Sequence, residues 1–293
     1  MKRIACMILT ICLLSAAIGF AQQTGKSDER SRPQPDRIVE FKTFDEGDPI
    51  TLHVFEPAGY STSGKIPAIV FFFGGGWNGG TPAQFYAQAE YFASRGILAI
   101  SAQYRQKQSH GVLPFECVAD GKSAIRWVRA HAKDLGIDPD RIAAGGGSAG
   151  GHVAASTAVI KGFEDEKSGV SSQPNALVLF NPALYLDSPR MAQRLNNRQL
   201  EISPAHHVRK GLPPTIIFHG EADTTVPFET ATDFTEKMHK AGNKCELVPF
   251  PGESHGFFNW RETGDNAAYK ATVRAADVFL TKLGYLSGKP TIK

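Results

Sequence analysis

The chain has 293 residues, of which 42% are hydrophobic and 21% charged, a composition typical of a soluble globular protein with a large core. Its formal net charge is +3 at pH 7, and loss of Lys2 and Arg3 would leave +1. So small a charge excludes bulk electrostatic attraction to nucleic acid or to an anionic membrane, and we expect a neutral partner.

Residues 1–21 are predicted to be a cleaved secretory signal peptide. Two basic residues precede an apolar stretch over 4–20, and Gly19 and Ala21 supply the small residues that a signal peptidase requires. The stretch is shorter than the roughly 20 apolar residues of a membrane span. We expect a secreted or periplasmic protein with no membrane anchor after cleavage; a retained anchor or a lipoprotein attached through Cys12 is the alternative.

A polar leader over 22–37 comes next, and we expect it to be flexible because it holds two prolines and no apolar periodicity. A single domain over 38–293 follows. It opens with two runs, "RIVEFKTF" and "ITLHVFEP", which flank the turn "DEGDP" and predict an antiparallel hairpin. The domain keeps only Cys117 and Cys245, and we expect both to be free thiols.

Short apolar runs then alternate with longer segments of helical period. The runs are "PAIVFFF", "GILAISA", "RIAAG", "NALVLFNP", "PTIIFHG" and "KCELVPF". This alternation predicts an α/β fold, with a mostly parallel central sheet, helices on both faces and the antiparallel N-terminal hairpin. One spacer has apolar residues three, four or seven apart, which indicates a helix reaching Leu135. Another opens with Thr81, Pro82 and Gln84, a predicted capping box.

The segment "FFFGGGWNGG", residues 71–80, places glycines directly after a buried strand. Gly74, Gly76 and Gly79 match the G-x-G-x-x-G dinucleotide pattern, but the next strand ends without the acidic side chain that holds a ribose. Neither "GKS" in the chain has the earlier glycine of a phosphate-binding loop. The adjacent histidines 206–207 have no further ligand at metal spacing. We therefore expect neither a cofactor nor a metal.

The stretch "RIAAGGGSAGGH" places Ser148 in G-x-S-x-G, between a strand predicted to end at Ala144 and a predicted helix. Such a turn strains the serine backbone and brings main chain close to it, which requires small neighbours. It also exposes the hydroxyl at a helix N-terminus. Ser148 is the candidate nucleophile, the alternative being an incidental serine in a flexible loop. His152, in the same helix, is expected to pack or to support the site.

A serine nucleophile needs a neutral histidine to take its proton and a carboxylate to orient that histidine. Asp223 follows "PTIIFHG" and His255 follows "KCELVPF", so both come after strands whose carboxyl ends share one edge with the strand before Ser148. The order Ser, Asp, His is the one expected for this architecture. Alternatively, Asp223 forms only an Asx-turn, and Glu221 or Asp233 is the acid. Because the histidine must be neutral, we expect activity to fall in acid.

The glycine loop is predicted to bind the negative oxygen of a tetrahedral intermediate. We expect the N–H groups of Gly75, Gly76 and Ala149 to form this oxyanion hole. Trp77, beside the loop, is expected to stack on a sugar ring or to line an acyl pocket. Ordinary packing is the alternative for the other aromatic residues near the catalytic loops, which are Phe257, Phe258 and Trp260.

With these motifs the sequence resembles the α/β-hydrolase superfamily, and more narrowly the bacterial esterases that carry H-G-G-G-W before the nucleophile elbow, many of them acetyl-xylan or feruloyl esterases. The resemblance covers about residues 38–285. It implies an α/β-hydrolase fold in which Ser148 is the nucleophile, Asp223 the orienting acid and His255 the general base. It also implies that the glycine loop binds the oxyanion.

One position departs from that family: its histidine before the three glycines is Phe73 here. The family's histidine braces the loop through hydrogen bonds, whereas a phenylalanine braces it only by packing. The polar, proline-punctuated segment 184–210, called the lid segment below, lacks the long apolar face of an interfacial lipase.

We therefore expect a secreted serine carboxylesterase that hydrolyses short acyl esters, acetyl esters above all, on small molecules or polysaccharide. Two alternatives remain. The first is a peptidase of the prolyl-oligopeptidase type with the same triad. The second is a catalytically inactive carbohydrate-binding protein of the same fold.

Overall fold

The computed structural model describes residues 33–45, 47–164 and 169–292. The predicted signal peptide and most of the predicted leader lie outside these residues. Asp36 already belongs to the folded domain, because its N–H donates to the Val54 carbonyl at 2.8 Å and its carboxylate accepts from the Glu56 N–H at 2.7 Å. None of the described helices is long and apolar enough to cross a membrane.

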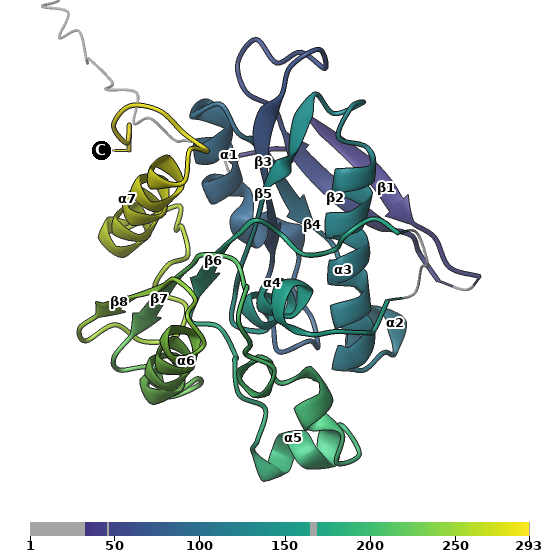
Figure 1. Ribbon diagram of the computed structural model, residues 1–293, viewed down its shortest axis with the longest axis vertical. Coiled ribbons are helices and arrows are strands. Elements are labelled where there is room, and N and C mark those ends of the chain that lie inside the picture. The colour runs from purple at the N-terminus through teal and green to yellow at the C-terminus, as the bar shows by residue number, and fades with distance from the viewer. Residues whose placement is uncertain (1–32, 46, 165–168, 293) are drawn as a thin grey trace, which may run out of the picture. The chain divides into compact units, whose positions relative to one another are not determined.

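The described residues form an eight-stranded sheet in the order β1-β2-β4-β3-β5-β6-β7-β8 (Figure 1). Its strands are β1 (Arg37–Lys42), β2 (Ile50–Phe55), β3 (Ile66–Phe72), β4 (Leu98–Ala102), β5 (Ile137–Gly147), β6 (Ala176–Phe180), β7 (Thr215–Gly220) and β8 (Cys245–Phe250). β2 pairs antiparallel with β1 and with β4, and the other neighbours are parallel. The predicted hairpin and parallel sheet are confirmed.

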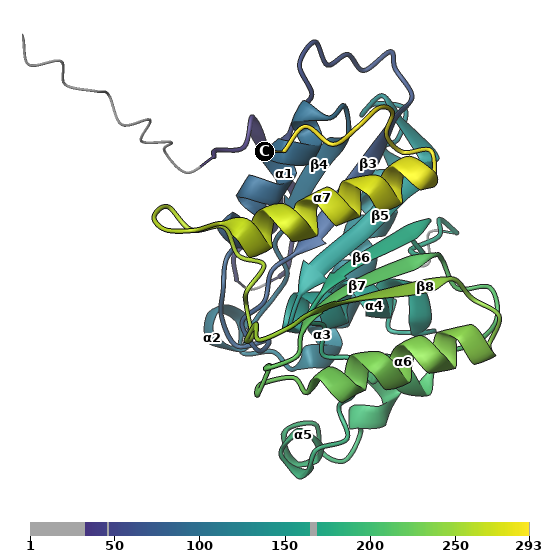
Figure 2. The same cartoon turned by 90° about the vertical axis from the view of Figure 1, so that its left-hand side faces the viewer.

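Helices cover both faces of the sheet, with α1 and α7 on one face and α3, α4 and α6 on the other (Figures 1 and 2). The helices are α1 (Tyr86–Ser94), α2 (Lys107–His110), α3 (Pro114–Ala130), α4 (Ala149–Val159), α5 (Pro189–Arg194), α6 (Phe228–Lys240) and α7 (Ala267–Lys282), with 3-10 turns η1 (Pro82–Phe85), η2 (Gln199–Ile202) and η3 (Pro204–His206). β3, β4, β6 and residues 142–147 of β5 are buried on both sides, which explains why their sequences read as continuous runs without charged residues.

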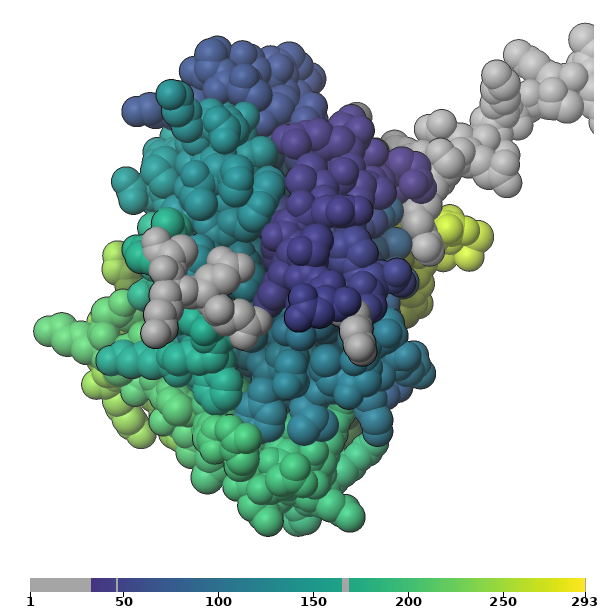
Figure 3. All heavy atoms as spheres, turned by 90° about the vertical axis from the view of Figure 1, so that its right-hand side faces the viewer, coloured from purple at the N-terminus to yellow at the C-terminus, as the bar shows by residue number. Residues whose placement is uncertain are grey.

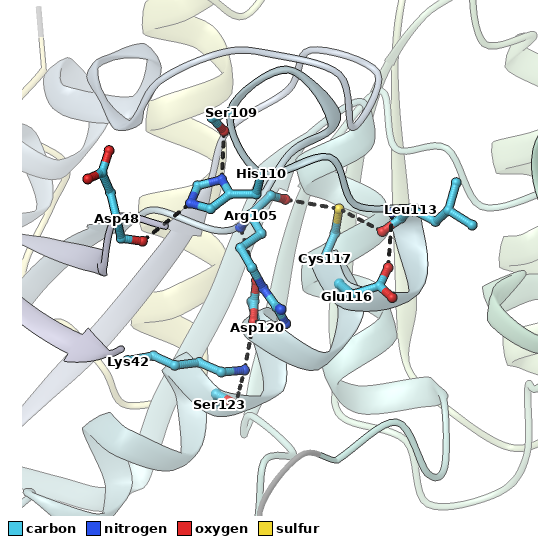
Figure 4. A network of polar contacts seen from close by, with 10 residues as sticks. All are labelled: Lys42, Asp48, Arg105, Ser109, His110, Leu113, Glu116, Cys117, Asp120 and Ser123. Atoms are coloured by element: carbon cyan, nitrogen blue, oxygen red, sulfur yellow. Dashed lines mark hydrogen bonds and ion pairs between the residues drawn. The ribbon is translucent and has the colours of Figure 1, made fainter. Parts of the chain in front are cut away.

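The hairpin is joined to α3 by a buried ion network (Figure 4). The Asp120 side chain is fully buried, and its Oδ1 accepts from Lys42 Nζ at 2.7 Å and from Arg105 Nη2 at 2.9 Å. Its Oδ2 accepts from the N–H and the Nε of Arg105 at 3.0 and 2.8 Å. Every carboxylate lone pair is thus used by a charged or backbone donor, as a buried charge requires. β1 contacts α3, and Figure 3 shows the purple N-terminal part of the chain against blue and teal parts on this face.

Three local predictions need revision. The capping box at Thr81 is wrong, because η1 has no side-chain cap and the Gln84 amide bonds elsewhere. The helix predicted to reach Leu135 ends at Ala130, although Leu135 is buried in the turn that follows. The strand predicted to end at Ala144 continues to Gly147, paired with β6.

Both cysteines of the domain are buried free thiols, as expected. Burial raises the pKa of Cys117, and it raises the pKa of Cys245 to about 11. Neither group therefore has the thiolate character of a reactive cysteine at neutral pH.

The lid segment, which holds α5, η2 and η3, lies beyond the carboxyl ends of the parallel strands (Figure 2). It leaves the sheet after β6 and returns at β7. Hydrogen bonds join the beginning of the segment to its end: the Ala205 N–H donates to the Leu184 carbonyl at 3.0 Å, and the Leu186 N–H donates to Ser203 Oγ at 3.1 Å. It is therefore placed beside the edge of the sheet where the candidate site residues lie.

Candidate active site

Ser148 lies on the turn between β5 and α4. Its backbone has φ 54° and ψ −119°, a conformation that costs a non-glycine residue on the order of 1–3 kcal/mol. Neighbouring main chain holds it there: the Ser148 N–H donates to the Phe180 carbonyl at 3.0 Å, and the Ala183 N–H donates to the Ser148 carbonyl at 3.2 Å. The turn presents a partly exposed hydroxyl at the start of a buried helix.

Gly150 shows why this turn needs residues without side chains. A Cβ at Gly150 would lie 2.0 Å from the Phe72 carbonyl oxygen and 2.3 Å from that of Phe73. These contacts are with backbone, which cannot move aside. The first turn of α4 therefore packs directly against the end of β3, which brings Ser148 next to the glycine loop that follows that strand.

The three predicted triad residues meet at this edge of the sheet. His255 Nε2 lies 2.9 Å from Ser148 Oγ, and His255 Nδ1 lies 2.7 Å from Asp223 Oδ2. An ionised carboxylate only accepts hydrogen bonds, so Nδ1 carries the imidazole proton and Nε2 is left to accept from the serine hydroxyl. The side chain of His255 is 25% exposed, and that of Asp223 is fully buried. The imidazole is therefore open to substrate on one side only.

Asp223 serves both of the purposes considered for it. Its Oδ1 accepts from the N–H groups of Thr225 and Val226 at 2.8 and 2.9 Å, which is the Asx-turn. Its Oδ2 is left to face His255. The two alternative acids, Glu221 and Asp233, are exposed and contribute no side-chain contact to the histidine.

The residues predicted to bind the oxyanion lie beside Ser148. A Cβ on Gly74 would come within 3.3 Å of the Ser148 Cβ, so the oxyanion loop, residues 74–80, touches the nucleophile. Within the described residues, no hydrogen bond uses the N–H of Gly75 or Gly76. Ala149 is the first residue of α4, so its N–H has no acceptor inside the helix. These three donors are therefore available to a ligand.

Gly75 is required by its backbone as well as by its neighbours. Its φ is +126°, and a Cβ there would lie 1.9 Å from the Gly79 carbonyl oxygen. The Gly75 carbonyl accepts from the N–H groups of Asn78 and Gly79 at 3.0 and 3.3 Å, which closes the loop into a tight turn.

The oxyanion loop is braced from both ends. At its start, Phe73 stacks on Tyr104 with ring centroids 4.4 Å apart, and the Tyr104 hydroxyl donates to the Phe73 carbonyl at 2.7 Å. The phenylalanine thus braces by packing, as expected. Further along, Gln84 Oε1 accepts from the Gly74 N–H at 2.6 Å, and Arg194 of the lid segment donates to the Gly76 carbonyl at 2.8 Å.

Trp77 does not lie where a substrate platform would. It is 6% exposed, its φ is 56°, and its Nε1 donates to His152 Nδ1 at 3.1 Å. His152 is fully buried and donates from Nε2 to the Ile202 carbonyl of the lid segment at 2.6 Å. The tryptophan and the histidine therefore join the oxyanion loop to the lid segment, and the substrate contact expected of Trp77 gains no support from its position.

Burial lowers the pKa of His152 from 6.5 to about 4, so the ring is neutral at physiological pH. In the unfolded chain an ordinary imidazole binds its proton near pH 6.5. Below that pH the unfolded state binds more protons than the folded state, and the folded state loses stability. The loss from this residue alone amounts to about 3 kcal/mol by pH 4. Burial also lowers the pKa values of His53 and His219, which adds to the trend.

We expect His152→Gln to flatten the dependence of the unfolding free energy on pH between 6.5 and 4. Glutamine can still accept from the Trp77 N–H and donate to the Ile202 carbonyl, but it does not titrate. Urea unfolding curves at several pH values would measure the difference, with the exposed His206→Gln as the control. A variant that loses as much stability in acid as the parent protein would contradict this assignment.

Sequence reasoning missed several residues that hold the site together. Asn181 Oδ1 accepts from the Gly256 N–H at 3.3 Å, next to His255. His219 Nε2 donates to the Val226 carbonyl at 2.8 Å and lies 3.5 Å from Asp223 Oδ2. The one sequence feature that could have pointed to Asn181 and His219 is their position at the carboxyl ends of β6 and β7. Phe257 and Phe258 are 5% and 1% exposed in the core, so the packing alternative applies to them.

No group of three or more His, Cys, Asp or Glu side chains suited to a metal occurs among the described residues. His206 lies 3.5 Å from Asp187, and the bond that His207 Nε2 makes is to the Leu200 carbonyl at 2.8 Å.

The family model BD-FAE matches residues 52–180 and 181–238. Among solved structures, esterase 2 of Thermogutta terrifontis, phosphoramylated by tabun, is 51% identical with a TM-score of 0.83, covering 86% of this chain and 96% of its own. Among curated proteins, esterase LipC of Mycobacterium tuberculosis is 30% identical over 74% of this chain and 58% of its own length. An acetylxylan esterase of Xylanibacter ruminicola is 27% identical over 59% of this chain and 37% of its own.

The chain spans about half the length of the curated relatives it matches, with shares of 58%, 46% and 53% for the first three. It spans nearly all of the T. terrifontis esterase. These comparisons support an α/β-hydrolase fold and a carboxylic ester hydrolase.

Proposed function

The chain belongs to the BD-FAE family, and from that membership we propose that it is a serine carboxylesterase that hydrolyses short acyl esters, acetyl esters above all, through Ser148, His255 and Asp223. The observation that carries the proposal is the continuous hydrogen-bonded line from Ser148 Oγ through His255 to Asp223, at 2.9 and 2.7 Å. This line lies next to the N–H groups of Gly75 and Gly76, which donate no hydrogen bond within the described residues, and to that of Ala149 at the start of α4.

In the first half-reaction, Ser148 Oγ attacks the ester carbonyl carbon while His255 Nε2 takes the hydroxyl proton. The carbonyl oxygen becomes negative and accepts hydrogen bonds from the N–H groups of Gly75, Gly76 and Ala149, each worth roughly 10²–10³ in rate. The bond to the alkoxy oxygen then breaks. The alkoxy oxygen takes the proton from His255, and the alcohol leaves an acyl-serine behind.

In the second half-reaction, water attacks the acyl-serine and gives a proton to His255 Nε2. The second tetrahedral intermediate collapses, the proton returns to Ser148 Oγ, and the carboxylic acid is released. Asp223 stays ionised throughout and stabilises the imidazolium that forms twice in the cycle.

Two observations favour short acyl groups and a hydrophilic substrate. The T. terrifontis esterase has been solved with propionate and with butyrate bound. Within the described part of the lid segment, Leu200 is the exposed large apolar side chain, so that segment offers no broad apolar face to a lipid surface. Secretion remains part of the proposal and rests on the apolar stretch of residues 4–20.

The proposal is tested by assaying the purified protein on p-nitrophenyl acetate, butyrate and palmitate, on acetylated xylan, and on a proline p-nitroanilide. We expect the acetate ester to be cleaved best, acetate to be released from the polysaccharide, and the anilide to resist. Cleavage of the anilide in preference to the esters would favour a peptidase. Absence of both activities, together with no labelling by a fluorophosphonate, would favour a binding protein.

A further inference from the structure

A pocket of about 380 Å³ opens beside the oxyanion loop. Its walls come from two regions that lie far apart in the chain, residues 74–87 and residues 259–260. The oxyanion loop contributes Gly74 and Gly75, the turn after it Thr81 and Gln84, and the segment after His255 contributes Asn259 and Trp260. The mechanism described above does not use this space.

The pocket adjoins the reaction centre. Gly75 is both a wall of the pocket and a predicted oxyanion donor, and Gly74 touches Ser148. Among the other lining residues, Asn259 is fixed to the histidine loop, because its N–H and its Nδ2 donate to the Gly256 carbonyl at 3.1 and 2.8 Å. A substrate bound at Ser148 therefore has this pocket immediately beside it.

The position of the pocket indicates that it lies on the side of the reaction centre where the alcohol portion of an ester is bound. His255 Nε2 must give its proton to the leaving alkoxy oxygen, so the alcohol lies on the side of the histidine loop, which continues into Asn259 and Trp260. The volume points the same way, because a two-carbon acyl group would fill only a small part of 380 Å³.

The walls have the chemistry that a hydroxylated ring requires. A bond from Gln84 Nε2 to Asn259 Oδ1 at 3.0 Å holds the two amides in place and leaves amide hydrogens free to face a ligand. Thr81 is exposed, with a hydroxyl that makes no hydrogen bond within the described residues. Trp260 is half-buried, and one part of its ring packs against the cluster of Ala87, Tyr269 and Val273. An aromatic ring fixed on one side with polar groups around it can receive the apolar face of a sugar.

We propose that this pocket binds the alcohol portion of the substrate, a sugar ring that stacks on Trp260 and bonds to Thr81 and the two amides. This inference rests on the proposed function and names its substrate class. It assigns to Trp260 the stacking role that the sequence suggested for the buried Trp77.

The test compares two acetate esters in Trp260→Ala, namely acetylated xylobiose and ethyl acetate, whose two-carbon alcohol has no ring to stack on Trp260. We expect the ratio of kcat/KM for the sugar ester to kcat/KM for ethyl acetate to fall about tenfold, mostly through KM of the sugar ester. Trp260→Phe should restore most of the ratio. Trp127→Ala, which removes a tryptophan of α3 whose ring centroid lies 4.0 Å from that of His131, should leave the ratio unchanged.

An unchanged ratio in Trp260→Ala, or an equal loss for both esters, would overturn the inference while leaving the proposed function standing. Xylobiose binding to the parent protein, followed by tryptophan fluorescence, gives a readout independent of hydrolysis and of how Trp260→Ala folds. We expect xylobiose to change the emission, and Trp260→Phe to remove that change. No response in the parent protein would also overturn the inference. Failure of the proposed function appears separately, as lack of hydrolysis of either ester by the parent protein.

Discussion

Ser148→Ala is expected to lower kcat for p-nitrophenyl acetate about 10⁶-fold, because it removes the hydroxyl that His255 Nε2 deprotonates to form the acyl-enzyme. The oxyanion donors and the pocket would remain, so residual hydrolysis above the rate in water is expected. Mass spectrometry after treatment with paraoxon should show one phosphoryl adduct on the parent protein and none on the variant.

Ser156→Ala provides the matched control. Ser156 lies two turns further along α4, is fully buried, and has an Oγ without a hydrogen-bond partner among the described residues. Losing that hydroxyl should alter neither kcat nor the paraoxon adduct. Full activity in Ser148→Ala, or an adduct that maps to another residue, would exclude Ser148 as the nucleophile.

Asp223→Asn is expected to lower kcat about 10⁴-fold while leaving the fold intact. Oδ1 of Asp223 accepts from two backbone N–H groups, so the oxygen of asparagine must take that position. The NH₂ group then faces His255 Nδ1 and can only donate. The imidazole would respond by moving its proton to Nε2, which can no longer accept from Ser148.

The kinetics of Asp223→Asn should show the loss in kcat with a smaller change in KM, since the substrate contacts are not altered. Glu221→Gln, an exposed carboxylate two residues away, serves as the control and should retain activity. If Glu221→Gln or Asp233→Asn lost activity and Asp223→Asn did not, the carboxylate of the triad would have to be reassigned.

The sheet and the line of triad residues could be predicted because both depend on local pattern. Short apolar runs that alternate with longer segments of helical period indicate the strands of a parallel sheet, and the carboxyl ends of parallel strands share one edge. Ser148, Asp223 and His255 could therefore be placed near one another, although the three stretches that hold them lie far apart in the sequence.

The bracing of the site could not be predicted because it depends on tertiary contacts. Gln84 has the spacing of a capping box, but its side chain bonds to the Gly74 N–H and to Asn259 Oδ1 instead of capping the helix. The sequence around Trp77 gives no sign that its Nε1 donates a hydrogen bond to Nδ1 of His152, which lies 75 residues further along the chain. Trp260 in turn faces a pocket built from segments that meet only in the folded chain.

The lid segment leaves and re-enters the sheet at two adjacent strands, β6 and β7, whose pairing Leu177↔Thr215 does not depend on how much chain runs between them. Its ties to the catalytic loops pass through the Arg194 side chain and the Ile202 carbonyl. A replacement of the lid segment that keeps these two hydrogen bonds would leave the arrangement of the catalytic residues unaltered. The length of this crossover can thus vary without altering the pairing of β6 with β7.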